Sequence, residues 1–114
     1  MPRRYYNLST VVLPNQTVSF SENSKTVDVA GVADRLILRW DTGCIDPSTN
    51  ERLVKVRVRI AGRDVSDRPL DGNDMMLTLE PEIDVRPGDL VEAEVRNDDK
   101  DNRHYVVILV GVKY

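Results

Sequence analysis

The sequence predicts an all-β protein: an antiparallel β-sandwich, most closely a jelly roll. Short segments alternate apolar and polar residues with a period of two, which is typical of strands with one buried face. Turn-forming residues separate these segments, and no segment has the apolar spacing of an amphipathic helix. A chain of 114 residues can form one domain with a modest core, and about eight such segments suit a sandwich or jelly roll.

The expected strands follow one another closely along the chain. They span residues 9–13, 16–21, 25–30, 35–40, 53–60, 75–80, 90–96 and 104–114. Polar and turn-forming residues separate them, at 14–15, 22–24, 31–34, 85–89 and 97–103. Two longer polar segments, 41–52 and 61–74, are expected as loops.

The segment 53–60 has the clearest alternation. Its inward set would be Val54, Val56, Val58 and Ile60, and its outward set Lys55, Arg57 and Arg59. The outward cations allow two interpretations: a basic stripe for phosphates, or an ion-paired face opposite Glu92 and Glu94. The net charge of −3 favours the ion-paired face.

The C-terminal segment 104–114 is rich in β-branched residues, as strands are. One face would carry His104, Val106, Ile108, Val110, Val112 and Tyr114, and the other Tyr105, Val107, Leu109, Gly111 and Lys113. Both faces are largely apolar, so we expect both to be covered.

The first eight residues have no apolar period and are expected to form an N-terminal arm, followed by a sandwich domain at 9–114. Tyr5 and Tyr6 are amphipathic rings of the kind that anchor one protein on another. The arm would either dock on a neighbouring subunit or fold back over its own sheet. The candidate interface residues are therefore Tyr5, Tyr6, Tyr105, Val107 and Leu109.

Composition argues against several function classes. The net negative charge and an aromatic content of 5% give no reason to expect nucleic-acid binding. One histidine and one cysteine, Cys44, cannot assemble a multi-cysteine zinc site or an internal disulfide. The basic N-terminus is not followed by an apolar stretch, so neither a signal peptide nor a membrane partner is expected. We expect no cofactor.

The triplet Asp41-Thr42-Gly43 follows an apolar strand, as the catalytic Asp of an aspartic protease does. In this respect the chain resembles the dimeric retroviral-type proteases, in which two such Asp residues share a proton. Gly62-Arg63-Asp64 resembles a second motif of that family, but a short loop and one strand replace the Gly-rich flap expected between the two. The favoured interpretation of the triplet is a polar turn, since Asp, Thr and Gly are turn formers.

Two further polar features have plain structural interpretations. The segment Val85–Val91 with His104 is similar to the strand entry of cupredoxins, but their copper site needs two His and a Cys placed differently. His104 is therefore expected to be a strand-start residue. The oxygen-rich run 97–102 lacks the Gly and distal Glu of an EF-hand loop and is expected to be a solvated hairpin tip.

A short, acidic, all-β chain with an N-terminal arm resembles the small jelly-roll virion proteins of phages, the capsid-decorating, cement and adaptor proteins. The resemblance covers the whole chain in pattern and rests on no specific motif. It implies a non-enzymatic homo-oligomer, located in a virion or the cytoplasm, that contacts capsid or tail proteins through its arm and through loops 41–52 and 61–74. The alternatives are a ligand- or glycan-binding β-sandwich module and, third, the dimeric aspartic protease.

Overall fold

The computed structural model describes residues 2–40, 45–65 and 74–114. Within these ranges the chain is built from strands, and the only helical turn is η1 (Phe20–Glu22). The strands are β1 (Arg3–Asn7), β2 (Thr10–Val12), β3 (Thr17–Val18), β4 (Ser24–Thr26), β5 (Gly31–Trp40), β6 (Val54–Ile60), β7 (Arg63–Asp64), β8 (Asp74–Val85), β9 (Leu90–Asn97) and β10 (His104–Lys113).

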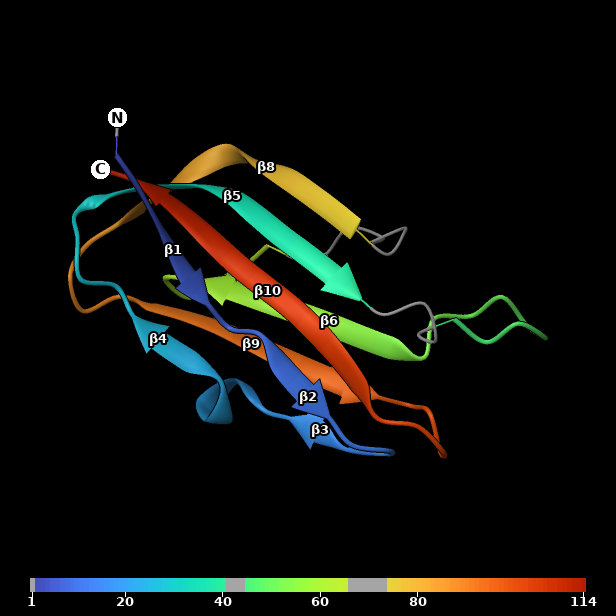
Figure 1. Ribbon diagram of the computed structural model, residues 1–114. Helices are drawn as coiled ribbons and strands as arrows, with labels where there is room; N and C mark the ends of the chain where they lie inside the picture. The colour runs from blue at the N-terminus through green and yellow to red at the C-terminus, as the bar shows by residue number, and fades with distance from the viewer. Residues whose placement is uncertain (1, 41–44, 66–73) are drawn as a thin grey trace.

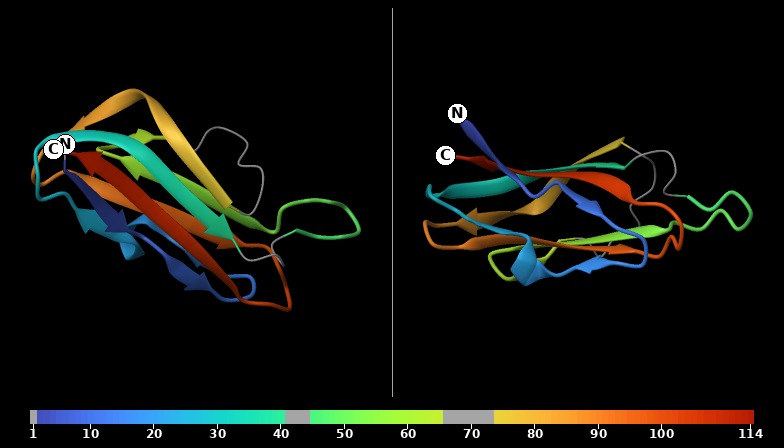
Figure 2. Two further views of the ribbon diagram at one scale, coloured as in Figure 1. Left: turned by 45° about the horizontal axis from the view of Figure 1, so that its top comes forward. Right: turned by 60° about the horizontal axis from the view of Figure 1, so that its bottom comes forward.

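The strands form two antiparallel sheets that pack face to face (Figures 1 and 2). Sheet A has the order β1–β10–β5–β8, and β2 also pairs with β10. Sheet B has the order β3–β9–β6–β7, and β4 also pairs with β9. The predicted all-β sandwich is confirmed.

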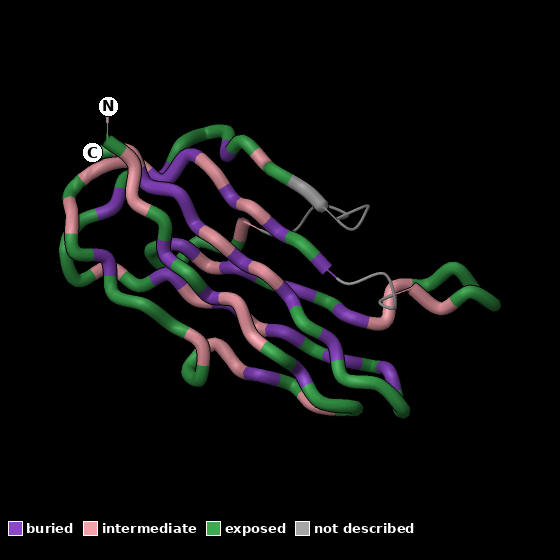
Figure 3. Tube along the Cα trace, in the orientation of Figure 1, coloured by how far each residue is buried: buried purple, intermediate pink, exposed green. Residues whose placement is uncertain are grey.

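The core lies between the sheets, because alternate residues of the central strands point inward. Buried and more exposed residues alternate along the strands in Figure 3. In β6, Val54, Val58 and Ile60 are fully buried and Val56 nearly so, while Lys55 and Arg57 are exposed. The predicted alternation of residues 53–60 is therefore confirmed.

The turn expected at 31–34 is wrong, because Gly31 begins β5 and pairs with Val85. A Cβ on Gly31 would stand 2.0 Å from the carbonyl oxygen of Lys113, so a side chain there would collide with the backbone of β10. Gly31 is thus a close-approach glycine within a sheet, not a turn residue.

The expected strand at 25–30 is shorter than predicted. Only Ser24–Thr26 forms β4, and the chain then leaves the sheet. The buried Val27 donates its backbone N–H to the Asp89 carbonyl at 2.8 Å and accepts from Gly88 N–H at 2.9 Å. These bonds hold the segment against the turn that precedes β9.

The segment expected as an N-terminal arm contributes a strand to the sandwich. Residues 3–7 form β1, which runs antiparallel to β10 with Tyr5 opposite Gly111 and Tyr6 opposite Val110. The chain continues into β2, where Val11 lies opposite Tyr105. Residues 3–7 therefore extend their own sheet edge to edge and do not lie across its face (Figure 1).

Candidate functional site

The outward face of sheet A carries an apolar patch, which we call the outer patch. The register places Val11 beside Tyr105 on one side of β10, and Leu109 beside Ile37 on the other. Ile37 in turn lies opposite Met76 of β8. The outer patch consists of Val11, Ile37, Met76, Tyr105, Val107 and Leu109.

The exposure of these side chains decides whether the outer patch is available to a partner. Met76 is 61% exposed, Tyr105 51% and Val11 47%. Ile37, Val107 and Leu109 are half-buried between their neighbours in the sheet. Scattered exposed apolar residues are normal, but a contiguous apolar group on one sheet face marks an interaction surface.

The inward face of β10 is fully covered. Val106, Ile108, Val110 and Val112 are completely buried against sheet B. The expectation that both faces of this strand are covered is confirmed for the inner face. On the outer face Tyr105 is exposed, and Val107 and Leu109 are half-buried. Among the candidate interface residues, Tyr105, Val107 and Leu109 share the outward face.

Tyr5 covers the C-terminal end of this outward face of β10 from within the same chain. Its ring lies beside Gly111, where Tyr5 Cε1 would be 3.0 Å from an added Cβ. Arg35 donates from Nη1 to the Tyr5 hydroxyl at 3.2 Å. The Tyr5 ring therefore occupies the space that the missing side chain of residue 111 leaves on β10.

Tyr6 points the other way and is buried in the core. Its hydroxyl donates to Asp28 Oδ1 at 2.5 Å and accepts from the backbone N–H of Asp28 at 3.2 Å. Burial is the main cause that raises the pKa of Tyr6. Of the two tyrosines proposed for an interface, the structure gives Tyr6 an internal role and leaves Tyr5 on the surface.

The outward face of sheet B, unlike that of sheet A, carries ion-paired charged side chains. Arg57 pairs with Asp64 at 2.7 Å, Arg59 with Glu92 at 3.5 Å, and Lys55 with Asp98 at 3.5 Å. The ring of Phe20 lies 3.8 Å from the Arg59 guanidinium carbon, within cation–π range. The ion-paired interpretation of this face is confirmed. Of the two predicted carboxylates, Glu92 forms an ion pair, whereas Asp64 and Asp98 take the place expected for Glu94.

The hairpin between β9 and β10 is closed by its own polar groups. Asp99 Oδ1 accepts from the backbone N–H groups of Asp101 and Asn102, and Asp99 Oδ2 lies 2.8 Å from His104 Nε2. The pKa of Asp99 is lowered to about 2, chiefly by the hydrogen bond from the backbone of Asp101 and next by the hydrogen bond with His104. The buried Asn97 donates from Nδ2 to the carbonyls of Val12, Leu13 and Asn102.

These contacts give the hairpin a structural role. His104 is buried at the start of β10, as the sequence predicted. Residues 100–103 at the tip are exposed, as predicted, while Asn97 and Asp99 beside them are buried and hydrogen-bonded. No group of three or more metal-ligating side chains occurs among the described residues.

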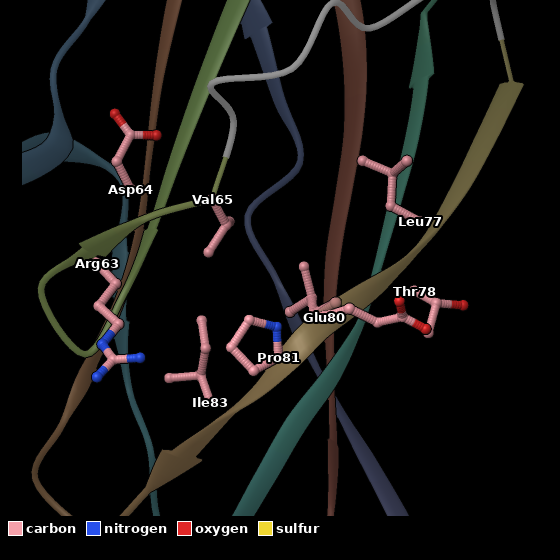
Figure 4. Close-up of a pocket in the computed structure, with 9 residues that line it drawn as sticks. Arg63, Asp64, Val65, Leu77, Thr78, Glu80, Pro81 and Ile83 are labelled. Carbon is pink, nitrogen blue, oxygen red and sulfur yellow. The ribbon is translucent and has the colours of Figure 1, made fainter.

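A pocket of about 260 Å³ opens between the edge strands β7 and β8 (Figure 4). Its apolar lining comes from Val65, Leu77, Leu79, Pro81 and Ile83, and its polar lining from Arg63, Asp64, Thr78 and Glu80. Leu79 and Ile83 are buried, so the inner wall of the pocket is part of the core.

The predicted protease triplet, Asp41-Thr42-Gly43, lies outside the described residues, and so does Cys44. Loop 41–52 is described from Ile45, which forms an isolated bridge with Arg52. The Arg52 guanidinium lies over the Trp40 ring, 4.6 Å from its centre. Loop 61–74 is described at Ala61–Val65, which includes β7, and at Asp74, where β8 begins.

Neither a protein-family model, a curated protein nor a solved structure matches the chain. In the part of the chain that the structure describes, no helix has the length and apolar character to cross a membrane. The proposal about function below is therefore based on the surfaces and the pocket described above.

Sequence reasoning identified half of the outer patch and missed the rest. Ile37 and Met76 join it only through the pairing of β5 with β10 and with β8. The one available signal was the alternation of residues 35–40, which placed Ile37 on the face opposite Leu36, Leu38 and Trp40. The pocket had no signal in the sequence, because it depends on how two edge strands of different sheets approach each other.

Proposed function

We propose that this protein is a non-enzymatic assembly protein that associates with further copies of itself through the outer patch. The observation that carries the proposal is the contrast between the two outer faces. On sheet B the outward cations of β6 are matched by carboxylates. On sheet A the outward residues Tyr105, Val107 and Leu109 of β10 carry no charge, although the exposed Arg39 of β5 lies opposite Val107. Met76, Tyr105 and Val11 of the outer patch are about half exposed or more.

Chemistry favours a second copy over an unrelated partner. In a two-fold interface the same patch meets itself, and an apolar patch is complementary to itself without any charge pairing. Homodimer interfaces are also more apolar than interfaces between independent proteins. Tyr105, at the end of the outer patch beside Val11, would supply a large ring of the type that dominates interface energies.

We further propose that the sandwich is a jelly roll. The pairing of the strands supports this: β1 and β2 pair with β10, β3 and β4 with β9, β5 with β8, and β6 with β7. The first half of the chain thus pairs with the second half in reverse order. Successive pairs alternate between sheet A and sheet B, as they do when one long hairpin is rolled into two sheets.

Jelly rolls are frequent in viral capsid proteins, which supports a place in a virion at a capsid or tail symmetry axis. This assignment rests on analogy of fold. Electron micrographs of the purified oligomer test it. A closed, symmetric assembly of two-fold dimers would support the assignment, and an open or irregular aggregate would count against it.

The self-association itself is tested by sedimentation velocity over a range of protein concentrations. The parent chain is expected to sediment as a dimer or a larger closed oligomer. Met76→Lys places a charge in the outer patch and should shift the chain toward the monomer. Leu90→Lys is the matched control, because Leu90 is 42% exposed and begins β9 in sheet B.

Two outcomes would contradict the proposal. One is a parent chain that is monomeric at every concentration. The other is an equal loss of mass in both lysine variants, which would indicate general destabilisation and not a specific interface.

A further inference from the structure

The pocket between β7 and β8 joins an apolar wall to a single cationic end. In Figure 4, Arg63 reaches toward Ile83, Pro81 lies next along β8, and Leu77 marks the far end. Val65 faces this row from the β7 side. The pocket is therefore a slot between two sheet edges with a mixed lining: a row of five apolar side chains, four polar residues and, among these, a guanidinium at one end.

The charged side chains around the slot differ in whether they can contact a bound ligand. Asp64 points away from Pro81 and Ile83, and its carboxylate is held by Arg57 at 2.7 Å. Glu80 and Thr78 extend from the side of β8 that faces away from Arg63. The Arg63 side chain is exposed, and it makes no hydrogen bond or ion pair with any other described residue, while its backbone pairs with Ile60 of β6.

We propose that this pocket binds a small amphiphilic carboxylate, with its carboxylate on Arg63 and its hydrocarbon part along Val65, Leu77, Leu79, Pro81 and Ile83. The planar guanidinium presents paired donors that match the two oxygens of a carboxylate. Five apolar side chains favour a hydrocarbon tail over a sugar, which would leave buried hydroxyl groups without partners.

The size of the pocket limits the ligand. Its volume of about 260 Å³ lies just below the usual range of small-molecule sites, roughly 300–1,000 Å³. A short acyl chain or a single aromatic ring fits this space better than a disaccharide or a long lipid. The site is separate from the outer patch, because it lies between the sheets and not on the outward face of sheet A.

The test is an NMR titration of the isotope-labelled full chain with octanoate, 1-octanol and glucose as probes. Octanoate should shift the amide signals of β7 and the middle of β8. Octanol, which has the same chain length without the charge, should shift the same signals more weakly. Glucose should cause no shifts there.

Two charge variants separate the guanidinium from general electrostatics. Arg63→Gln should weaken octanoate binding by at least about tenfold, equivalent to 1.4 kcal/mol, and leave octanol binding unchanged. Arg103→Gln removes the same charge from an exposed position in the β9–β10 hairpin and should leave both unchanged. Val65→Phe fills the slot and should weaken both probes.

Four results would overturn the inference: no octanoate shifts, shifts located on the outer patch, equal weakening by Arg63→Gln and Arg103→Gln, or binding of glucose in preference to octanoate. None of these depends on the oligomeric state. Failure of the pocket therefore leaves the self-association proposal intact, and failure of self-association leaves the pocket intact.

Discussion

The ring of Tyr5 lies over Gly111, so that Tyr5 Cε1 would be 3.0 Å from a Cβ on residue 111. This contact joins the N-terminal strand to the C-terminal strand on the outward face of sheet A. An aromatic ring that covers a strand glycine protects an otherwise bare stretch of backbone. The contact also explains how residues 3–7 are held within their own domain.

Gly111→Ala should therefore destabilise the protein. Crowding of a packed site costs about 1–3 kcal/mol, which exceeds the gain of about 0.4–1 kcal/mol from a less flexible unfolded chain. In a Tyr5→Ala background the ring contact is removed, while the Arg35 Cβ at 3.2 Å and the Arg3 Cδ at 3.4 Å stay close, so the same substitution should cost less than in the parent. Urea unfolding of the four proteins measures this coupling. Equal destabilisation in both backgrounds would show that the Tyr5 ring does not occupy this space.

The register of β10 predicts unequal costs for neighbouring truncations. Ile108 is fully buried, so Ile108→Ala should lower the free energy of unfolding by about 2–5 kcal/mol. Leu109 is half-buried on the outward face, so Leu109→Ala should cost about 1–2 kcal/mol or less. Both are measured by urea unfolding at low protein concentration. The reverse order would indicate that β10 is shifted by one residue.

Asp99 makes the free energy of unfolding depend on pH in the acidic range. Its pKa is lowered from 3.8 to about 2, so the folded state favours the carboxylate. The contribution is fully present above about pH 4 and is lost as the pH falls toward 2. Asp99→Asn should therefore be less stable than the parent at neutral pH, and the difference should shrink between pH 4 and pH 2.

Urea midpoints across this pH range measure the effect. Asp101→Asn is the matched control in the same hairpin, because Asp101 is exposed. A constant difference between parent and Asp99→Asn at all pH values would contradict the assignment. So would the same pH dependence of the difference for Asp101→Asn.

The sequence predicted the sandwich well where alternation is strong and local. β6, β9 and β10 were recognised because each contains several inward β-branched residues. β1 was expected as an arm because only Tyr6 of its five residues is buried, which leaves no apolar period. Gly31 was interpreted as a turn residue because the need for a close approach to the Lys113 carbonyl depends on the long-range pairing of two strands.

The outer patch could be predicted from the sequence only in part, for the same reason. Tyr105, Val107 and Leu109 share one face of a single strand, so period two was enough to group them. Val11, Ile37 and Met76 join them through three other strands, and their registers are not encoded in any local pattern. The pocket of Arg63 and Ile83 likewise brings together residues from two different sheets.

In the proposed assembly, the outer patch is buried between copies of the chain. The most direct test of this burial is the accessibility of the Met76 methyl group to a soluble paramagnetic probe, measured by NMR on the parent chain with the Leu90 methyl groups as the internal reference. Both side chains are exposed in the single chain, at 61% and 42%. We predict that at high protein concentration the Met76 signal is protected while the Leu90 signals are broadened. Equal broadening of both residues at every concentration would contradict the account.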